Sequence, residues 1–166
     1  GKDNISVIVV KVSGDTVDEI TKHFEHRLNI IKEVIIFKNL TYKEMMLLLS
    51  MAEVKKYQKD ELIANEGEKG EDFGIILKGK VDIIKNNQLL VSLSKGQQFG
   101  EMSLIDHSPR SASVVAADEC EVMSISRKNF YSLIRKEPEL STKLLWGLLQ
   151  VLSVRLRAAN DALTQV

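Results

Sequence analysis

The segment of residues 54–126 limits the fold more than any other part of the chain. It consists of short apolar runs rich in β-branched residues, separated by turn-forming pairs such as Lys78-Gly79, Asn86-Asn87 and Lys95-Gly96. The runs recur about every ten residues, and no helical pattern alternates with them. This spacing predicts about eight short strands in a sandwich, barrel or jelly roll, with a hairpin at Asn86-Asn87.

Helical patterns flank this β segment on both sides. Before it, apolar residues follow three- and four-residue steps over residues 17–35, and a capping box at Thr41 and Glu44 opens a shorter helix. After it, Ser126 is a suitable N-cap for a short helix, and Pro138 is typical of the first turn of a long one. The expected fold class is therefore mainly β with flanking helices, namely N-terminal helices and a long C-terminal helix.

The long C-terminal helix carries two rows of apolar residues. The first has the alternating four- and three-residue spacing of a heptad seam, and the second precedes it: Leu145, Leu149, Leu152, Leu156, Ala159 and Leu163, then Leu140, Leu144 and Leu148. Two rows favour one facing the β segment and the other facing a partner helix, which predicts a homodimer through this helix. The alternative is a helix that packs only on its own domain. The single tryptophan, Trp146, is expected in the core, with a position that caps the ligand as the alternative.

The balance of charge excludes several classes of function. Lysine and arginine number 23, as do aspartate and glutamate, so the chain has no net field to hold nucleic acid or an anionic membrane. No apolar run approaches the roughly 18–20 residues of a membrane-spanning helix, and one cysteine allows no internal disulfide. We therefore expect a cytoplasmic chain with neither nucleic acid nor membrane as partner. His23, His26 and His107 lack metal-ligand spacing, so no metal site is expected.

The residues that point to chemistry are concentrated around Gly100 and Arg110. Gly100 leaves room for close backbone approach, and the N–H groups of the turn after it form a cradle for an anion. Arg110 adds a planar fork of donors that can bind two oxygens of one phosphate, and Ser111 can add a hydroxyl donor. Because the chain has no net charge, an anion must be bound at a local site. The donors gathered here are suited to a phosphate.

Glu101 indicates which kind of phosphate compound fits. A carboxylate beside the cradle repels phosphate unless it faces another part of the ligand, and a ribose 2′-hydroxyl is a suitable donor for it. A cyclic nucleotide meets both requirements, because its phosphate is fused to the ribose and the 2′-hydroxyl lies on the neighbouring carbon. The alternative is a structural ion pair between Glu101 and Arg110 that closes a loop.

The two motifs Phe99-Gly100-Glu101-Met102-Ser103-Leu104 and Pro109-Arg110-Ser111-Ala112-Ser113-Val114 resemble the phosphate-binding cassette of cyclic-nucleotide-binding domains. The resemblance extends upstream through residues 66–73 and 75–81, and it covers residues 37–160. It implies a β-roll, a jelly roll of the double-stranded β-helix type, with Glu101 on the ribose 2′-hydroxyl and Arg110 on the cyclic phosphate. The implied ligand-binding residues are Gly100, Glu101, Met102, Ser103, Arg110, Ser111 and Ala112. Gly74 departs from the family, where a bulky residue is commoner, but is not expected to touch the ligand.

Ser111 leaves two bases open. Its hydroxyl can contact the 2-amino group of a guanine in the syn conformation, which favours cGMP, but it can equally serve the phosphate of cAMP. We expect cAMP in preference to cGMP.

Residues 3–10, which begin with Asp3 and Asn4, resemble the last strand of metal-dependent (PPM-type) protein Ser/Thr phosphatases, where the aspartate is a metal ligand. An ordinary strand preceded by an Asp-Asn turn is the alternative, and Asp3 alone cannot hold a catalytic metal. The expected domain division is a remnant strand of a preceding domain at 1–14, a linker helix at 15–36, and a cyclic-nucleotide-binding domain at 37–166 that includes the C-terminal helix. The resemblance implies a phosphatase as the fused or adjacent effector.

The predicted function is regulatory: a cyclic-nucleotide sensor that controls this effector. The chain shows no nucleophile beside a base, no metal cluster and no triad, so neither catalysis nor a metal cofactor is expected within it. The alternative is a structural dimerisation module of the same fold that no longer binds ligand.

Overall fold

The computed structural model describes residues 15–106 and 108–164. The remnant strand expected at residues 1–14 and the phosphatase resemblance of residues 3–10 therefore lie outside the described residues. The helices, including one short 3-10 helix η1, are α1 (Asp15–Glu33), η1 (Ile35–Phe37), α2 (Tyr42–Ser50), α3 (Met102–Ile105), α4 (Arg127–Lys136) and α5 (Pro138–Thr164). The strands are β1 (Ala52–Tyr57), β2 (Leu62–Ala64), β3 (Asp72–Lys78), β4 (Lys80–Lys85), β5 (Gln88–Ser94), β6 (Gln98–Phe99), β7 (Ser113–Ala116) and β8 (Cys120–Ser126).

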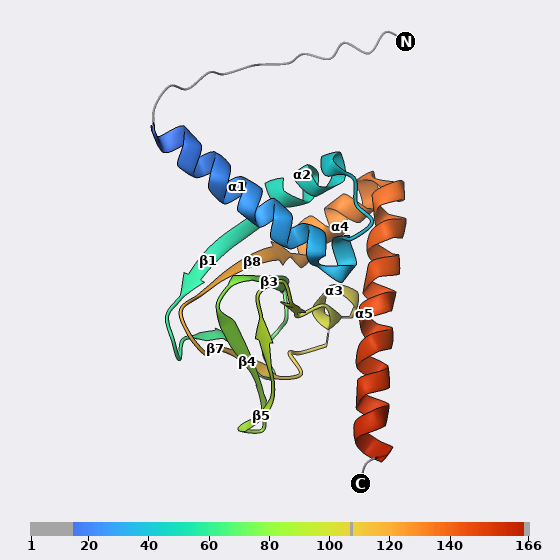
Figure 1. Ribbon diagram of the computed structural model, residues 1–166. Coiled ribbons are helices and arrows are strands. Elements are labelled where there is room, and N and C mark those ends of the chain that lie inside the picture. The colour runs from blue at the N-terminus through green and yellow to red at the C-terminus, as the bar shows by residue number, and fades with distance from the viewer. Residues whose placement is uncertain (1–14, 107, 165–166) are drawn as a thin grey trace.

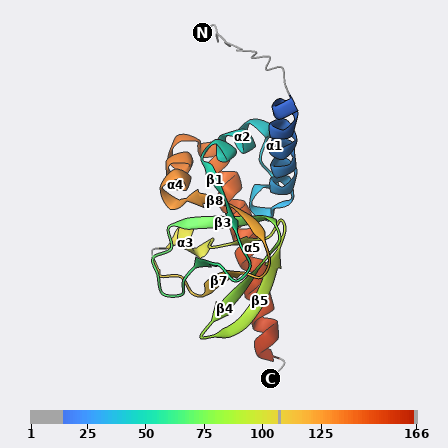
Figure 2. The ribbon, with the colours of Figure 1, turned by 90° about the vertical axis from the view of Figure 1, so that its left-hand side faces the viewer.

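The strands form two four-stranded antiparallel sheets, with the orders β1-β8-β3-β6 and β2-β7-β4-β5. Both views of the ribbon place α1, α2 and α4 at one end of this roll, while α5 extends along its side (Figures 1 and 2). The predicted class, mainly β with about eight strands and helices at both ends, is confirmed. The predicted hairpin joins β4 to β5, where Asn86 and Asn87 have φ of 50° and 61°, the conformation that a tight two-residue turn requires.

Strand β3 shows why the central runs are continuously apolar, because both of its faces are buried. Phe73, Ile75 and Leu77 point toward the helices and belong to the larger core cluster. Ile76 points into the roll, where it packs with Phe99 and other residues of a second cluster. Since neighbouring strand residues face opposite sides, one strand serves both cores. The second half of α1 joins the larger core through Leu28, Ile30 and Ile31.

Glu44 links α2 to α5 through a predicted capping box. The Thr41 backbone N–H donates to Glu44 Oε2 over 2.6 Å, and the Thr41 hydroxyl accepts from the Glu44 N–H, so the capping box is confirmed. The Lys143 ammonium donates to Glu44 Oε1 and Oε2 at 2.8 and 2.9 Å. Burial by itself raises the pKa of the Glu44 carboxyl, but the hydrogen bonds from Lys143 and Thr41 outweigh burial and hold the pKa below its usual value of 4.5.

Replacing Glu44 by glutamine should therefore destabilise the fold in a pH-dependent way. A carboxyl with a lowered folded-state pKa stabilises the fold above its unfolded-state pKa, and this contribution disappears as the pH falls through the folded-state value. We expect Glu44→Gln to lower the free energy of unfolding by about 1 kcal/mol at pH 7, since the pair is partly exposed to solvent. The difference from wild type should shrink well below pH 4.5. Urea unfolding at pH 7 and pH 3.5 measures both, with the exposed Glu53→Gln as control; an equal difference at both pH values would contradict the assignment.

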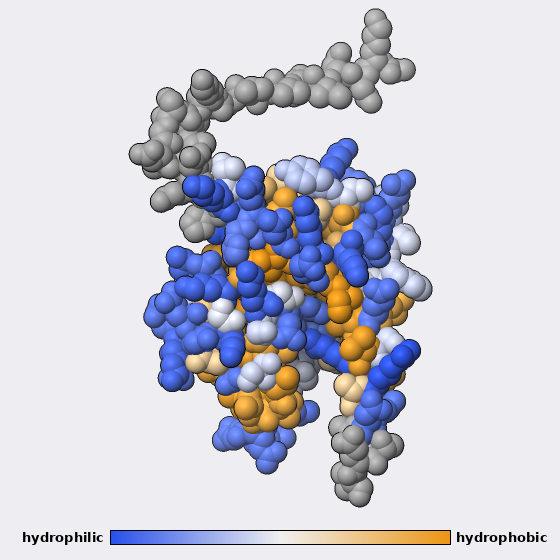
Figure 3. Space-filling model, viewed as in Figure 1, coloured by the Kyte–Doolittle hydropathy of each residue, from blue (hydrophilic) through white to orange (hydrophobic). Residues whose placement is uncertain are grey.

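Helix α5 buries one of its predicted rows and exposes the other. Leu140, Leu144 and Leu148 are buried in the larger core, whereas the heptad seam remains on the surface at Leu145, Leu149 and Leu156. Figure 3 shows apolar surface along α5 and over the β4–β5 hairpin. The core position expected for Trp146 is wrong, because its side chain is 58% exposed. Successive helix residues are 100° apart, so Trp146 points away from the face that Leu144 and Leu148 bury.

Candidate functional site

Gly100 connects β6 to the short helix α3 and packs against Arg110. Its φ of +77° lies in the left-handed region that side chains other than glycine rarely adopt. A β-carbon at this position would collide with the Arg110 guanidinium and lie 2.9 Å from the carbonyl oxygen of Asp72. Conformation and packing therefore both require glycine here. Because glycine has no side chain, the Arg110 guanidinium can lie directly beside the turn that begins α3.

Arg110 is held in place by the loop between β2 and β3 and by the start of β3. Its guanidinium donates from Nη2 to Asp72 Oδ1 over 2.5 Å and to the Asp72 carbonyl over 2.9 Å. Its backbone N–H donates to the Glu68 carbonyl over 2.7 Å, and its own carbonyl accepts from the Gly67 N–H over 2.9 Å. The side chain is almost fully buried, at 7% exposure. A planar donor group is thus fixed in one orientation beside the anion cradle.

Glu101 is buried at the N-terminal end of α3, with 1% exposure. Its Oε1 forms an ion pair with Nη1 of Arg155 from α5, and Nη2 of Arg155 donates to the Gln98 carbonyl over 3.0 Å. Within the described residues, Glu101 Oε2 is the one buried side-chain oxygen or nitrogen that lacks a hydrogen-bond partner. A buried acceptor without a donor is unfavourable. The atom is therefore suited to accept a donor from a bound molecule.

The other predicted ligand residues lie around this pair. Met102 is exposed on the first turn of α3, and Ser103 follows it in the same helix. Ser111 is exposed beside Arg110, while Ala112 is buried. Met102 and Ser111 are therefore accessible to solvent next to Glu101 and Arg110 in the chain.

Gly74 lies beside Phe99, the residue that precedes Gly100, although no sequence pattern predicted this position. It pairs with Phe99 between β3 and β6, and a β-carbon at Gly74 would collide with the Phe99 ring. The glycine therefore makes room for the aromatic ring that immediately precedes Gly100. Glycine at position 74, where the family commonly has a bulky residue, thus helps to place the turn at Gly100. This role requires no contact between Gly74 and the ligand.

Three residues of the site were not found from the sequence: Asp72, Arg127 and Arg155. Arg127, the first residue of α4, donates from Nη2 to the carbonyls of Gly70 and Asp106 at 2.8 and 2.7 Å. It thereby ties the end of α3 to the loop before β3. No local sequence signal marks these residues, because each contact joins segments that lie far apart in the chain.

In the two described ranges, no group of three or more His, Cys, Asp or Glu side chains is arranged to hold a metal ion. None of the described helices has the length and apolar character needed to cross a membrane.

Comparison with known proteins identifies the family. The family model of the cyclic nucleotide-binding domain matches residues 54–137, about half of the chain. A cGMP-dependent protein kinase from Toxoplasma gondii is 35% identical over 136 residues, which are 82% of this chain and 14% of the kinase. The chain thus corresponds to a small part of that relative's length.

Solved structures agree with the family model. A cyclic nucleotide-binding domain from Methylobacillus flagellatus superimposes with a TM-score of 0.77 at 34% identity, and the match covers 87% of this chain and 85% of that one. The cAMP-bound structure of PfPKA-R has a TM-score of 0.68 at 26% identity, over 91% of this chain and 49% of that one. With its two-sheet roll, flanking helices and buried Glu101 and Arg110, this chain belongs to the cyclic nucleotide-binding domain family.

Proposed function

We propose that the chain binds a cyclic nucleotide in the turn between Gly100 and Arg110 and acts as a ligand-sensing regulatory domain. Glu101 would accept the ribose 2′-hydroxyl, and Arg110 would bind the cyclic phosphate. The observation that carries the proposal is the buried Glu101 Oε2, an acceptor without a donor, next to a turn that brings a guanidinium against Gly100. A hydroxyl would supply the missing donor.

The pairing of charges also supports this assignment. Glu101 forms its ion pair with Arg155, and Arg110 forms one with Asp72. The negative charge of the buried carboxylate is therefore balanced from α5, which reduces its repulsion of an incoming phosphate. This arrangement disfavours the alternative in which Glu101 and Arg110 serve only to close a loop on each other.

A comparison of ribose and 2′-deoxyribose ligands tests the role of Glu101. We expect wild type to bind cAMP or cGMP roughly 10- to 100-fold more tightly than the 2′-deoxy compound, the range expected for a hydrogen bond to a charged group. In Glu101→Ala the two affinities should agree within about twofold, because the acceptor is absent. Calorimetric titration of both ligands into both proteins gives the four affinities.

The control for this comparison is Glu53→Ala, which removes an exposed carboxylate from β1. It should keep the wild-type preference for the ribose ligand. Equal binding of ribose and deoxyribose ligands by wild type would remove Glu101 from the site, and no binding of either at millimolar concentration would favour the structural module.

The choice of base is proposed to depend on Ser111. The sequence favoured cAMP, but the Ser111 side chain is exposed beside Arg110, where its hydroxyl is accessible to a base. The Toxoplasma relative is named for cGMP, and PfPKA-R is bound to cAMP. We propose cGMP as the preferred ligand and cAMP as the competitor.

Replacing Ser111 by alanine should accordingly lower the affinity for cGMP about fivefold and leave that for cAMP within about twofold. Only guanine carries the 2-amino group that the hydroxyl would contact, and one such hydrogen bond contributes roughly 1 kcal/mol. Competition titrations with both nucleotides measure the two changes. An equal loss for both would assign the hydroxyl to the phosphate and return the preference to cAMP.

For the effector we propose a protein Ser/Thr phosphatase joined to the N-terminal side, with residues 1–14 as its last strand, 15–36 as a linker helix and 37–166 as the ligand-binding unit. The support is the resemblance of residues 3–10 to PPM-type phosphatases. Phosphatase assays of the longer parent protein, with and without cyclic nucleotide, test it. A parent protein without phosphatase activity would overturn this part alone.

The exposed heptad seam supports a homodimer through α5. Leu145, Leu149 and Leu156 are each at least half exposed at heptad spacing. A shallow pocket of about 400 Å³ beside them is lined in part by Leu145, Trp146 and Leu149. Sedimentation velocity over a range of concentrations tests the dimer, and a monomer at all concentrations would reject both the homodimer and the alternative dimerisation module.

A further inference from the structure

Helix α4 is strongly basic in a chain without net charge. Its ten residues include Arg127, Lys128, Arg135 and Lys136 and no acidic residue, whereas the whole chain has 23 basic and 23 acidic residues. Phe130 and Leu133 anchor the helix in the core. The positive charge is therefore concentrated on the part of α4 that faces away from that core.

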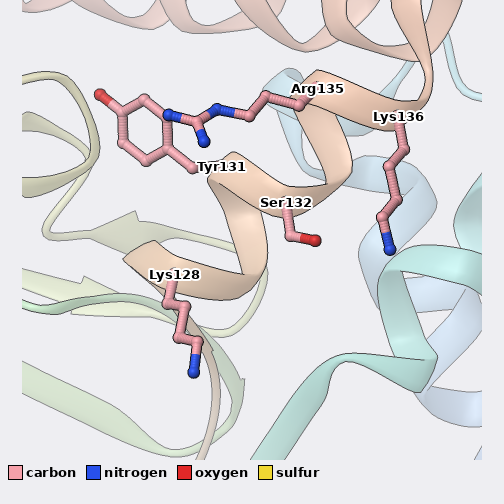
Figure 4. A pocket seen from close by; sticks show the side chains of 5 residues that line it. All are labelled: Lys128, Tyr131, Ser132, Arg135 and Lys136. Carbon is pink, nitrogen blue, oxygen red and sulfur yellow. The ribbon is translucent and has the colours of Figure 1, made fainter.

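The outward face forms a pocket of about 420 Å³ lined by five residues, Lys128, Tyr131, Ser132, Arg135 and Lys136. Figure 4 shows that all five side chains come from the same helix. Among the residues that the structure describes, Lys128, Arg135 and Lys136 form no ion pair. Arg127 differs, because it is bonded to the loop before β3 and to the end of α3.

The helix dipole of α4 accounts for the positions of Arg135 and Lys136 but not for that of Lys128. Arg135 and Lys136 lie in the last turn, where the helix dipole favours positive charge. Lys128 lies in the first turn, where the dipole disfavours it. Lys128 contributes neither to the dipole nor to an ion pair, and it lies seven residues, about two turns, before Arg135, so these two cations share one face of the helix and are available to an anion.

The spacing of the cations selects an extended ligand. Lys128 and Lys136 are eight residues apart, which corresponds to about 12 Å along a helix. In Figure 4 the side chains of Lys128 and Lys136 do not converge on one point, so a single phosphate group would not contact both as they stand. An extended peptide advances about 3.3 Å per residue, so four or five residues with alternate carboxylates cover the distance. Tyr131 and Ser132 also line the pocket, and their hydroxyls can bond to a peptide backbone.

We propose that the basic pocket on α4 is a docking site for an extended acidic peptide segment of a partner protein. The site is separate from the cyclic nucleotide site, and the inference does not depend on ligand binding there. It is nevertheless presented on a fixed support, because Arg127 ties the start of α4 to α3 and the Asn129 side chain donates to the Met51 carbonyl over 3.0 Å.

Fluorescence anisotropy with a labelled eight-residue peptide of alternating glutamate and serine tests the site. At low salt we expect saturable binding by the wild-type chain that weakens as salt increases. The triple variant Lys128→Ser, Arg135→Ser, Lys136→Ser should bind the peptide at least about tenfold more weakly, because three charge contacts are lost. All three side chains are exposed, so the variant should keep the circular dichroism of the folded protein. Its melting temperature should fall by a few degrees at most, because serine is a weaker helix former and the favourable charges at the helix end are lost.

The matched control is the triple variant Lys59→Ser, Lys85→Ser, Lys95→Ser, which removes the same charge from exposed positions outside α4. It should retain the wild-type affinity within about twofold. Equal losses in the two triple variants would show attraction to overall charge and overturn the proposal, as would the absence of binding by wild type. Displacement of the peptide by inorganic phosphate at equal charge would instead identify a site for small anions, and would likewise overturn it.

Discussion

Replacing Arg110 by alanine is expected to weaken cyclic nucleotide binding about a thousandfold or more while the fold remains intact. The guanidinium is buried, oriented by Asp72 and placed against Gly100, so its loss would remove the planar donor group proposed to bind the phosphate. Removing one partner of a buried, hydrogen-bonded charge pair typically weakens binding by 2–5 kcal/mol or more, and about 4 kcal/mol corresponds to a thousandfold. Calorimetric titration measures the change.

The fold should tolerate this substitution because the partner carboxylate is not trapped. The Asp72 side chain is 46% exposed, so water can solvate it once the guanidinium is gone. We expect the melting temperature to fall by only a few degrees, the equivalent of about 1 kcal/mol. Arg110→Lys, which keeps the charge and loses the fork, should bind at an intermediate level.

Arg157→Ala is the matched control, since it removes an exposed arginine from α5 two residues beyond Arg155. It should leave ligand affinity within about twofold of wild type. If Arg110→Ala binds as well as wild type, the phosphate assignment is wrong. If it fails to fold, Arg110 is chiefly a structural residue and the intermediate affinity of Arg110→Lys becomes the deciding measurement.

The second large effect is expected at Gly147, where α5 crosses η1. A β-carbon at Gly147 would lie 2.6 Å from both the Cα and the carbonyl oxygen of Ile36. These are backbone atoms, so a side-chain rotation cannot relieve the collision. Gly147→Val should lower the free energy of unfolding by about 3 kcal/mol, the upper part of the range for overpacking, and the melting temperature by roughly 10 °C.

Gly147→Ala provides a sharper test, because the sign of its effect on stability is expected to differ from that at an exposed helix position. At an exposed helix position, glycine to alanine stabilises by about 1 kcal/mol. At Gly147 we expect destabilisation instead, because the collision with Ile36 exceeds the gain in helix propensity. Gln150→Ala, on the exposed side of the same helix, is the control and should change stability by less than about 0.5 kcal/mol. Stabilisation by Gly147→Ala would show that α5 and η1 separate easily.

Much of the fold followed from local sequence patterns. The strand count, the Asn86-Asn87 hairpin and the cap at Ser126 depend on residues close together in the chain, and the structure confirms them. The prediction that Trp146 is buried was wrong, because residue type indicates burial only on average. Helix α5 instead buries the face that carries Leu144 and Leu148.

In the candidate site, too, local residues could be predicted from the sequence and long-range contacts could not. Gly100, Glu101 and Arg110 lie in one segment and could be found from their pattern. Their partners could not, because Arg155 is 54 residues from Glu101 and Asp72 is 38 residues from Arg110. Long-range pairs depend on how the roll places β3 and α5 against the turn. A single sequence shows that a buried carboxylate needs a partner without showing which arginine supplies it.

The close contact between Gly147 and Ile36 gives α5 a fixed point about which the helix can tilt. The helix has 27 residues and is about 40 Å long, with Gly147 as the pivot on Ile36. Arg155 lies eight residues from this pivot, about 12 Å, so a tilt of about 10° displaces it by about 2 Å, enough to separate it from Glu101. Thr164 is about twice as far from the pivot and would move about twice as much. Residues 153–161 of α5 are exposed, so the ion pair between Arg155 and Glu101 is one of the contacts that hold this part of the helix, and a domain attached beyond its end would be displaced with it.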